Sequence, residues 1–289
     1  MTAIWEDQIS LHSRVDPVFD TVAPAATWKD DDAHPTNWDA ELGDVSLELE
    51  RDQAVLPTTP DREGYFGPHH FSYWASGLRD HRNLMAGAER LGVNVQRYLD
   101  MGCASGRVIR HFAAQTPEIK TLGCDINRKH IEWVTQHLDP SVVAFQNTSI
   151  PNLPLADGSV DLVSAFSVFT HIEALETTWL MELDRILAPG GMAWITVHTE
   201  DTWLEMGQGW PLYNAIKNHP DFTDNASPMT MSSTVRNGRV GWRIGGDTGH
   251  RSPGRPPIRK RDDGRSSTWA VRPGSFGPGQ IPNACSEAV

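Results

Sequence analysis

The sequence predicts an α/β protein built on a doubly wound, mostly parallel β-sheet. Between residues 71 and 200, short apolar runs alternate with amphipathic stretches of helical length. A turn of small residues at 100–106 joins the first of these runs to the next helix. Strands that alternate with helices in this way form a parallel sheet covered on both faces. Such a sheet brings the carboxyl ends of its strands to one edge, where ligands bind.

Hydrophobic periodicity places each element of this middle region. We expect helices over 71–92, 107–115, 128–138 and 174–187, and strands over 95–100, 120–125, 142–146, 160–166 and 192–198. The last helix carries Leu175, Trp179, Leu183 and Leu187 on one stripe. Pro189, followed by two glycines, is expected to end it.

Composition excludes several classes of protein. The 289 residues are 39% hydrophobic and carry a net charge of −12. This negative charge argues against a protein that binds nucleic acid over its whole surface. No segment approaches the roughly 20 apolar residues of a membrane span, and the first residues do not read as a signal peptide. The cysteines, Cys103, Cys124 and Cys285, form no disulfide framework. We therefore expect a cytoplasmic protein with reduced thiols.

The uneven distribution of charge predicts three parts. Residues 1–64 carry 15 acidic against 4 basic side chains, whereas residues 233–289 carry 10 basic against 4 acidic and contain no leucine. We expect an acidic N-terminal extension over 1–70, a ligand-binding domain over 71–232 and a basic Gly/Pro/Arg-rich tail over 233–289. The extension is expected to cap the side of the site where a substrate, the acceptor, would bind.

The turn at 100–106 brings main chain close to a ligand or to a neighbouring element. Its small residues are Gly102, Ala104 and Gly106, and a dinucleotide-binding turn would place a further glycine where Arg107 stands. The alternative is a tight turn that only packs a helix onto a strand. Asp125 ends the next strand, 19 residues after Gly106. Its carboxylate can accept hydrogen bonds from ribose hydroxyls or cap the following helix.

Together these residues resemble the class I S-adenosylmethionine (SAM)-dependent methyltransferases, which have a Rossmann-like fold. The matching segments are DMGCASG at 100–106, GCDIN at 123–127, LPLADGSVDLV at 153–163, SVFTHI at 167–172 and ELDRILAPGG at 182–191. The chain is most similar to small-molecule methyltransferases of the type 11/12 kind. This resemblance implies a SAM-dependent methyltransferase that acts on a small acceptor, such as a sugar or another metabolite with a hydroxyl or amine.

The resemblance also implies roles for individual residues. Asp100 would hold the methionine ammonium, and Gly102, Cys103, Ala104 and Gly106 would wrap the methionine and ribose. Asp125 would take the ribose hydroxyls and Ile126 would pack on adenine. Ser149, or its neighbours Asn147 and Thr148, would reach the adenine amino group, and Phe166 and Ser167 would line the sulfonium. No metal is expected.

Methyl transfer to an oxygen benefits from a general base, and histidine suits that task near neutral pH. His171 follows the fourth expected strand and is our catalytic candidate. His198, His69 and His70 are weaker candidates. For each of the four, an ordinary structural hydrogen bond is the alternative.

The tail departs from the resemblance. A class I sheet continues with a helix and an antiparallel pair of strands, but residues 233–289 show no strand or helix period. We expect these strands to be missing, through natural disorder or a change of reading frame near residue 232. Two paired strands within 233–289 would contradict the reading-frame interpretation. The rival functions are a SAM-binding protein without activity, a nicotinamide-dependent oxidoreductase and a nucleic-acid-binding module that uses the tail.

Overall fold

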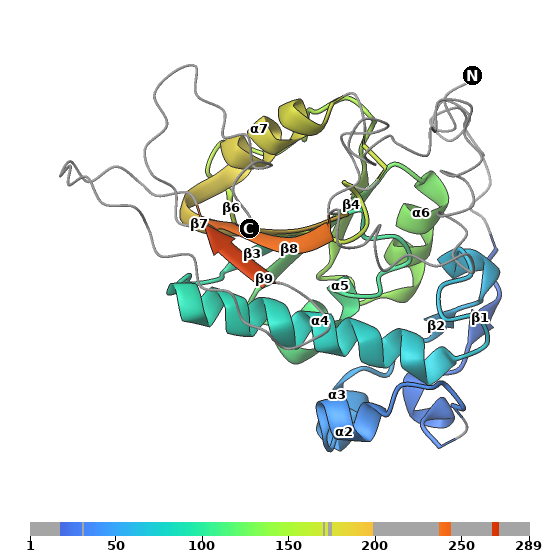
Figure 1. Ribbon diagram of the computed structural model, residues 1–289. Coiled ribbons are helices and arrows are strands. Elements are labelled where there is room, and N and C mark those ends of the chain that lie inside the picture. Colours follow the sequence, from blue (N-terminus) through green and yellow to red (C-terminus); the bar gives the residue numbers. More distant parts are fainter. Residues whose placement is uncertain are drawn as a thin grey trace, which may run out of the picture.

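The computed structural model describes residues 18–30, 32–169, 171–172, 175–198, 237–243 and 268–271. In these residues a seven-stranded sheet has the order β5-β4-β3-β6-β7-β8-β9 (Figure 1). Its strands are β3 (Arg97–Met101), β4 (Lys120–Asp125), β5 (Val143–Gln146), β6 (Val160–Ala165), β7 (Leu187–His198), β8 (Asn237–Arg243) and β9 (Thr268–Val271). The strands from β3 to β7 pair in parallel, so the predicted doubly wound α/β fold is confirmed.

The order of the strands reverses at the middle of the sheet. From β3 the chain runs outward through β4 to β5, then returns to place β6 on the other side of β3 and continues to β7. The carboxyl ends of β3 and β6 therefore flank a topological switch point, the place where open α/β sheets bind ligands.

Helices cover both faces of this sheet (Figure 1). The helices of the sheet region are α4 (His70–Leu91), α5 (Ile109–Gln115), α6 (Arg128–His137) and α7 (Glu176–Ile186). Successive strand residues pack on opposite faces, as the period of two requires. Tyr98 packs in one cluster with Leu84 of α4 and Phe112 of α5, whereas Leu99 packs in another with Leu183 of α7.

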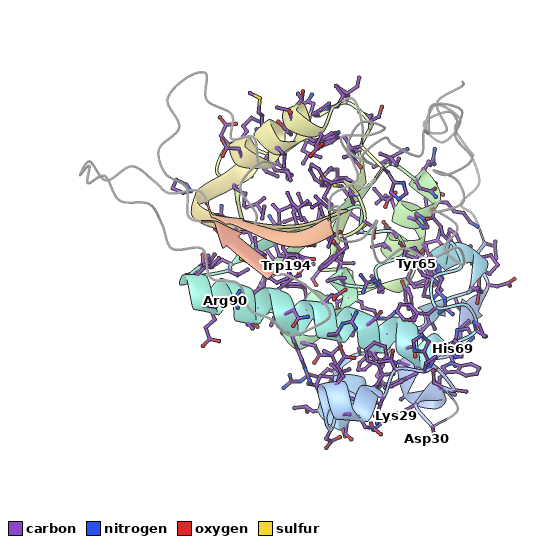
Figure 2. All side chains as sticks on the ribbon, viewed as in Figure 1. Lys29, Asp30, Tyr65, His69, Arg90 and Trp194 are labelled. Carbon is purple, nitrogen blue, oxygen red and sulfur yellow. The ribbon has the colours of Figure 1, made fainter. Side chains whose placement is uncertain are left out.

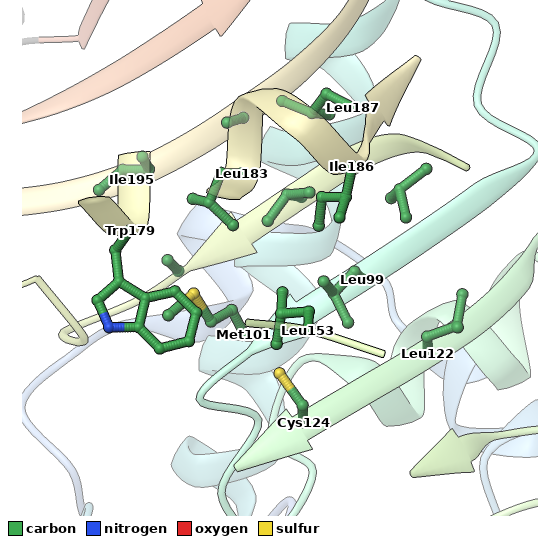
Figure 3. Packing of buried hydrophobic residues seen from close by; sticks show 14 of the residues in the cluster. Leu99, Met101, Leu122, Cys124, Leu153, Trp179, Leu183, Ile186, Leu187 and Ile195 are labelled. Atoms are coloured by element: carbon green, nitrogen blue, oxygen red, sulfur yellow. The ribbon is translucent and has the colours of Figure 1, made fainter. Parts of the chain in front are cut away.

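The core beneath α7 is continuous and almost entirely apolar (Figure 3). Trp179, Leu183 and Ile186 reach from α7 onto Leu99 and Met101 of β3 and their neighbours. Trp179 and Leu183 of the predicted stripe are buried here, whereas Leu175 precedes the helix and is 38% exposed, and Leu187 lies in β7. Burial of this face orders the carboxyl ends of the central strands.

The N-terminal segment folds as a cap on α4 and α5. Its elements are β1 (Thr21–Val22), the 3-10 turn η1 (Ala25–Trp28), α2 (Trp38–Leu42), α3 (Ser46–Arg51), β2 (Leu56–Pro57) and the 3-10 turn η2 (Pro60–Arg62). Buried Asp52 joins this cap to the sheet domain. It accepts hydrogen bonds from Arg110 Nε at 2.6 Å and from Trp74 Nε1 at 2.8 Å. The acidic N-terminal region thus contributes to the core, which its weak sequence pattern does not reveal.

Two findings correct details of the expected elements. Strand β7 begins at Leu187, because Pro189 and its glycines lie within a bulged strand opposite β6 and not in a separate turn. Beyond it, β8 pairs antiparallel with β7, and β9 pairs parallel with β8. The expectation that strands are missing from 233–289 is therefore wrong for these two segments. Because β8 and β9 are two paired strands within 233–289, they argue against a change of reading frame.

Some expectations concern residues that the structure does not describe, including Cys285 and the rest of the tail. Cys103 and Cys124 are free and buried, as expected. Among the described residues, no helix has both the length and the apolar character that a bilayer crossing requires.

We predict that Asp52→Ala strongly destabilises the protein. The substitution leaves the guanidinium of Arg110 buried without its carboxylate, a change that costs about 3–5 kcal/mol. Chemical denaturation should show this loss, whereas Asp39→Ala on the exposed face of α2 should change stability by less than about 0.5 kcal/mol. Equal effects of the two substitutions would contradict the anchoring role of Asp52.

Candidate functional site

A cavity of about 760 Å³ lies at the carboxyl ends of the parallel strands, beside the switch point between β3 and β6. Its size is within the range of small-molecule sites. The sequence-predicted residues that line it are Asp100, Gly102, Cys103, Ala104, Asp125, Ile126, Ser149, Phe166, Ser167 and His171. Gly106 is not among its lining residues. The fold therefore gathers nearly all the predicted positions around one space.

The small-residue turn is shaped by packing as well as by the cavity. Gly102 and Gly106 have φ values of 73° and 83°, which favour glycine. A Cβ on Gly102 would lie 2.3 Å from Val168 Cγ2, and one on Gly106 would lie 2.5 Å from Leu138 Cδ1. The groups that lie close to the main chain here are neighbouring side chains. These two glycines alone therefore do not indicate a ligand.

Asp125 connects the turn after β3 to the turn after β4. Its Oδ2 accepts a hydrogen bond from the Ala104 amide at 2.9 Å, and its Oδ1 accepts one from the Asn127 amide at 2.8 Å. Asn127, and not Asp125, provides the side-chain cap of α6. Desolvation by burial raises the pKa of Asp125. Each oxygen keeps a further lone pair, so the carboxylate can still accept hydrogen bonds from a ligand in the cavity.

Asp100 is a buried acid at the end of β3. Ser164 Oγ donates to its Oδ1 at 2.7 Å, and the hydroxyls of Ser164 and Tyr98 lie 2.6 Å apart. Burial raises the pKa of Asp100 to about 7, since the ionised carboxylate has lost its water. A cationic group in the cavity would favour the ionised form.

Asn147 follows β5 and presents an unused acceptor. Its Oδ1 is buried and has no hydrogen-bond partner among the described residues, while its Nδ2 donates to the Thr148 carbonyl at 3.2 Å. Buried acceptors are seldom left unpaired, so this atom suits a ligand that donates an N–H. The sequence placed Ser149 first at this position, with Asn147 and Thr148 as alternatives, and all three line the cavity.

The cavity also has lining residues from 61–73 that the sequence did not single out, although a cap over 1–70 was expected. Arg62, Glu63, Tyr65 and Tyr73 line it, and they come from the cap and the first turn of α4. Figure 2 shows Tyr65 and His69 near the start of α4, with Arg90 toward the other end of that helix. No hydrophobic period marks residues 61–67, so the only available signal was an unusual cluster of polar and aromatic residues.

The cap is fastened to the turn after β3 by a buried polar chain. Ser105 Oγ donates to the carbonyl of Asp61 and lies 2.9 Å from His130 Nδ1. His130 Nε2 in turn lies 3.0 Å from Glu63 Oε1, and this hydrogen bond lowers the pKa of Glu63. The cap therefore closes the cavity through contacts with α6 and the turn.

The histidine candidates separate by position. His171 lines the cavity, and its amide donates to the Val168 carbonyl at 2.9 Å. His69 contacts Asp32 and His70 contacts Arg62, and neither histidine lines the cavity. The side chain of His198 and the tryptophan-rich segment 203–210 lie outside the described residues.

A comparison with known families identifies the domain. Residues 99–195 match the family described as a methyltransferase domain, and they include the strands and turns that form most of the cavity. These residues form a methyltransferase domain of the class I SAM-dependent kind. The predicted family is confirmed.

Individual relatives resemble only part of the chain. The chain is 30% identical over 129 residues to a malonyl-[acyl-carrier protein] O-methyltransferase of Methylococcus capsulatus, covering 44% of this chain and 46% of the relative. A protein of the same name from Hahella chejuensis is 26% identical over 115 residues, covering 40% and 41%. This chain thus spans less than half the length of either relative.

A solved SAM-dependent methyltransferase from Aquifex aeolicus is also similar. It shares 16% identity with a TM-score of 0.36, covering 46% of this chain and 70% of its own.

We predict that Asp100→Asn stabilises the free protein in a pH-dependent way. The pKa of Asp100 is higher in the folded protein than in the unfolded chain. Its protonation therefore contributes fully to the free energy of unfolding below about pH 4, and this contribution is lost as pH rises through about 7. Asparagine mimics the neutral form at every pH. Its advantage should therefore grow by about 2 kcal/mol between pH 5 and pH 8, at 1.36 kcal/mol per pKa unit.

Chemical denaturation of both proteins at pH 5 and pH 8 measures this difference. An advantage of Asp100→Asn that is the same at both pH values would show that Asp100 is not a destabilised acid.

Proposed function

We propose that this protein transfers a methyl group from SAM to a small-molecule acceptor. The observation that carries the proposal is the convergence of Asp100, Asp125 and unpaired Asn147 Oδ1 on one cavity of a methyltransferase domain. These groups suit the three polar ends of SAM: an ammonium, a ribose diol and an adenine amine. When bound, SAM supplies an activated methyl group on a sulfonium.

The residues of the chain would bind and orient the cofactor. In this proposal Asp100 holds the ammonium in its ionised form, and Asp125 accepts hydrogen bonds from the ribose hydroxyls. Asn147 accepts one from the adenine amine, and Ile126 packs on the ring. The turn at 102–106, with Phe166 and Ser167, surrounds the methionine. Such positioning provides most of the catalysis when the donor is already activated.

The acceptor side would be formed by the cap. Arg62, Glu63, Tyr65 and Tyr73 line the cavity opposite the strand ends and would exclude water from it. We propose His171 as the general base that removes a proton from the acceptor, because it is the histidine candidate on this cavity. The domain limits at 70 and 232, and a place in the cytoplasm, remain predictions.

The relatives suggest a second, narrower acceptor. Two of them carry the name malonyl-[acyl-carrier protein] O-methyltransferase, so a carboxyl oxygen of an acyl group on a carrier protein is the alternative substrate. A panel of hydroxyl, amine and carboxyl acceptors, with labelled SAM, would separate these classes. Cofactor binding without turnover on any of them would favour the inactive SAM-binding protein.

We predict that the full chain binds SAM and S-adenosylhomocysteine and that Asp125→Ala weakens both by about 100-fold or more. The substitution removes two hydrogen bonds to a charged acceptor, each contributing about 1.5–3 kcal/mol. Calorimetric titration measures the affinities. Asp139→Ala, an exposed residue beyond the other end of α6, is the matched control and should bind normally.

Three results would contradict this proposal. A folded protein that binds neither compound would refute it, and so would an Asp125→Ala variant with unchanged affinity. Tighter binding of NADH than of SAM would favour the oxidoreductase.

A further inference from the structure

Arg62 is a buried cation that forms no ion pair within 4.0 Å among the described residues. Arg62 is 2% exposed and lines the cavity. Its Nη2 donates to the Gly67 carbonyl at 2.5 Å and lies 3.0 Å from His70 Nδ1. Its Nε and Nη1 are buried, and no group in the described part of the chain forms a hydrogen bond with either. A guanidinium stays protonated even where burial lowers its pKa, as it does here, so the positive charge is real.

Other inward-facing arginines of the described region are paired. Arg110 forms an ion pair with Asp52 at 2.6 Å, and Arg107 forms one with Asp80 at 2.7 Å. No ion pair within 4.0 Å involves Arg62 among the described residues. Burying a charge without a partner costs several kcal/mol, so such groups are retained where a ligand supplies the partner.

The groups that surround Arg62 neutralise its charge only in part. Its guanidinium stacks over the ring of Tyr73, 4.9 Å from the centroid, and burial raises the pKa of Tyr73 to about 12, so that phenol is neutral. Asp32 attracts Arg62 electrostatically, but its oxygens are occupied by the Ser72 and His34 amides and by His69. The free nitrogens of Arg62 therefore remain available to an anion.

We propose that Arg62 is the specificity-determining residue of the acceptor site and selects acceptors that carry a carboxylate. The inference rests on the proposed function, since it names the acceptor class of the same cavity. A planar guanidinium pairs with a planar carboxylate through two parallel N–H groups. Arg62 belongs to the cap, whereas Asp100 lies in β3 and Asp125 ends β4, so a carboxylate held by Arg62 leaves the strand ends to the cofactor.

The test uses the full chain, free and saturated with S-adenosylhomocysteine, and malonate as the carboxylate probe. Calorimetry measures binding of malonate, of neutral malonamide with the same shape, and of inorganic phosphate. We expect malonate to bind more tightly than phosphate. Malonamide lacks the charge and should bind at least about tenfold more weakly than malonate, because a hydrogen bond to a charged partner contributes about 1.5–3 kcal/mol.

Variants assign the effect to Arg62. Arg62→Gln should weaken malonate by about 10- to 100-fold and leave the affinity for S-adenosylhomocysteine unchanged. Arg62→Lys keeps the charge and should retain part of the malonate affinity. This variant provides the test if Arg62→Gln does not fold. Arg90→Gln is the matched control, because Arg90 is exposed near the far end of α4 (Figure 2), and it should bind like the wild type.

The outcomes for the two proposals are distinct. If S-adenosylhomocysteine binds but malonate does not, or malonamide binds equally well, the carboxylate proposal is wrong and the proposed function stands. Unchanged malonate affinity in both Arg62 variants would also overturn it, as would tighter binding of phosphate. Failure of S-adenosylhomocysteine to bind refutes the proposed function. In that case, binding of malonate to the free protein still tests whether Arg62 holds a carboxylate.

Discussion

The carboxylate of Asp125 holds together the two turns on which the cavity depends. By accepting the amides of Ala104 and Asn127, it fixes the turn after β3 against the turn after β4. Ala104 is kept at a φ of 45°, a conformation that non-glycine residues adopt at some cost. The same carboxylate is mostly buried and retains lone pairs toward the cavity. A single acid thus supports the local fold and offers a polar contact to a ligand.

The cap completes the cavity that the sheet begins. The sheet supplies the strand ends and buries its apolar side chains against α4, α5 and α7, which makes the edge rigid. The cap is joined to this frame by Asp52 with Arg110 and by Ser105 with the Asp61 carbonyl. Both connections use buried polar groups, which are satisfied only when the cap is in place. An acceptor enclosed by the cap would therefore meet a preorganised surface.

The parallel sheet and the strand-end residues of the cavity could be predicted from sequence because they depend on local patterns. The period of the apolar residues gave β3 and α7, and the position of Asp125 at a strand end indicated its place at the edge. Arg62 could not be predicted in this way. It lies in a segment without periodicity, and its importance comes from lacking a carboxylate partner, which only tertiary packing decides. Strands β8 and β9 were missed because residues 233–289 lack the alternation that normally marks a strand.

The central claim is that SAM binds across the turns after β3, β4 and β5. Amide hydrogen exchange of the full chain, with and without saturating S-adenosylhomocysteine, tests it most directly. The account predicts slower exchange in peptides that cover residues 102–106, 125–127 and 147–149, with little change in α2 or at the far end of α4. Slower exchange confined to other parts of the chain, or none at these three turns, would contradict it.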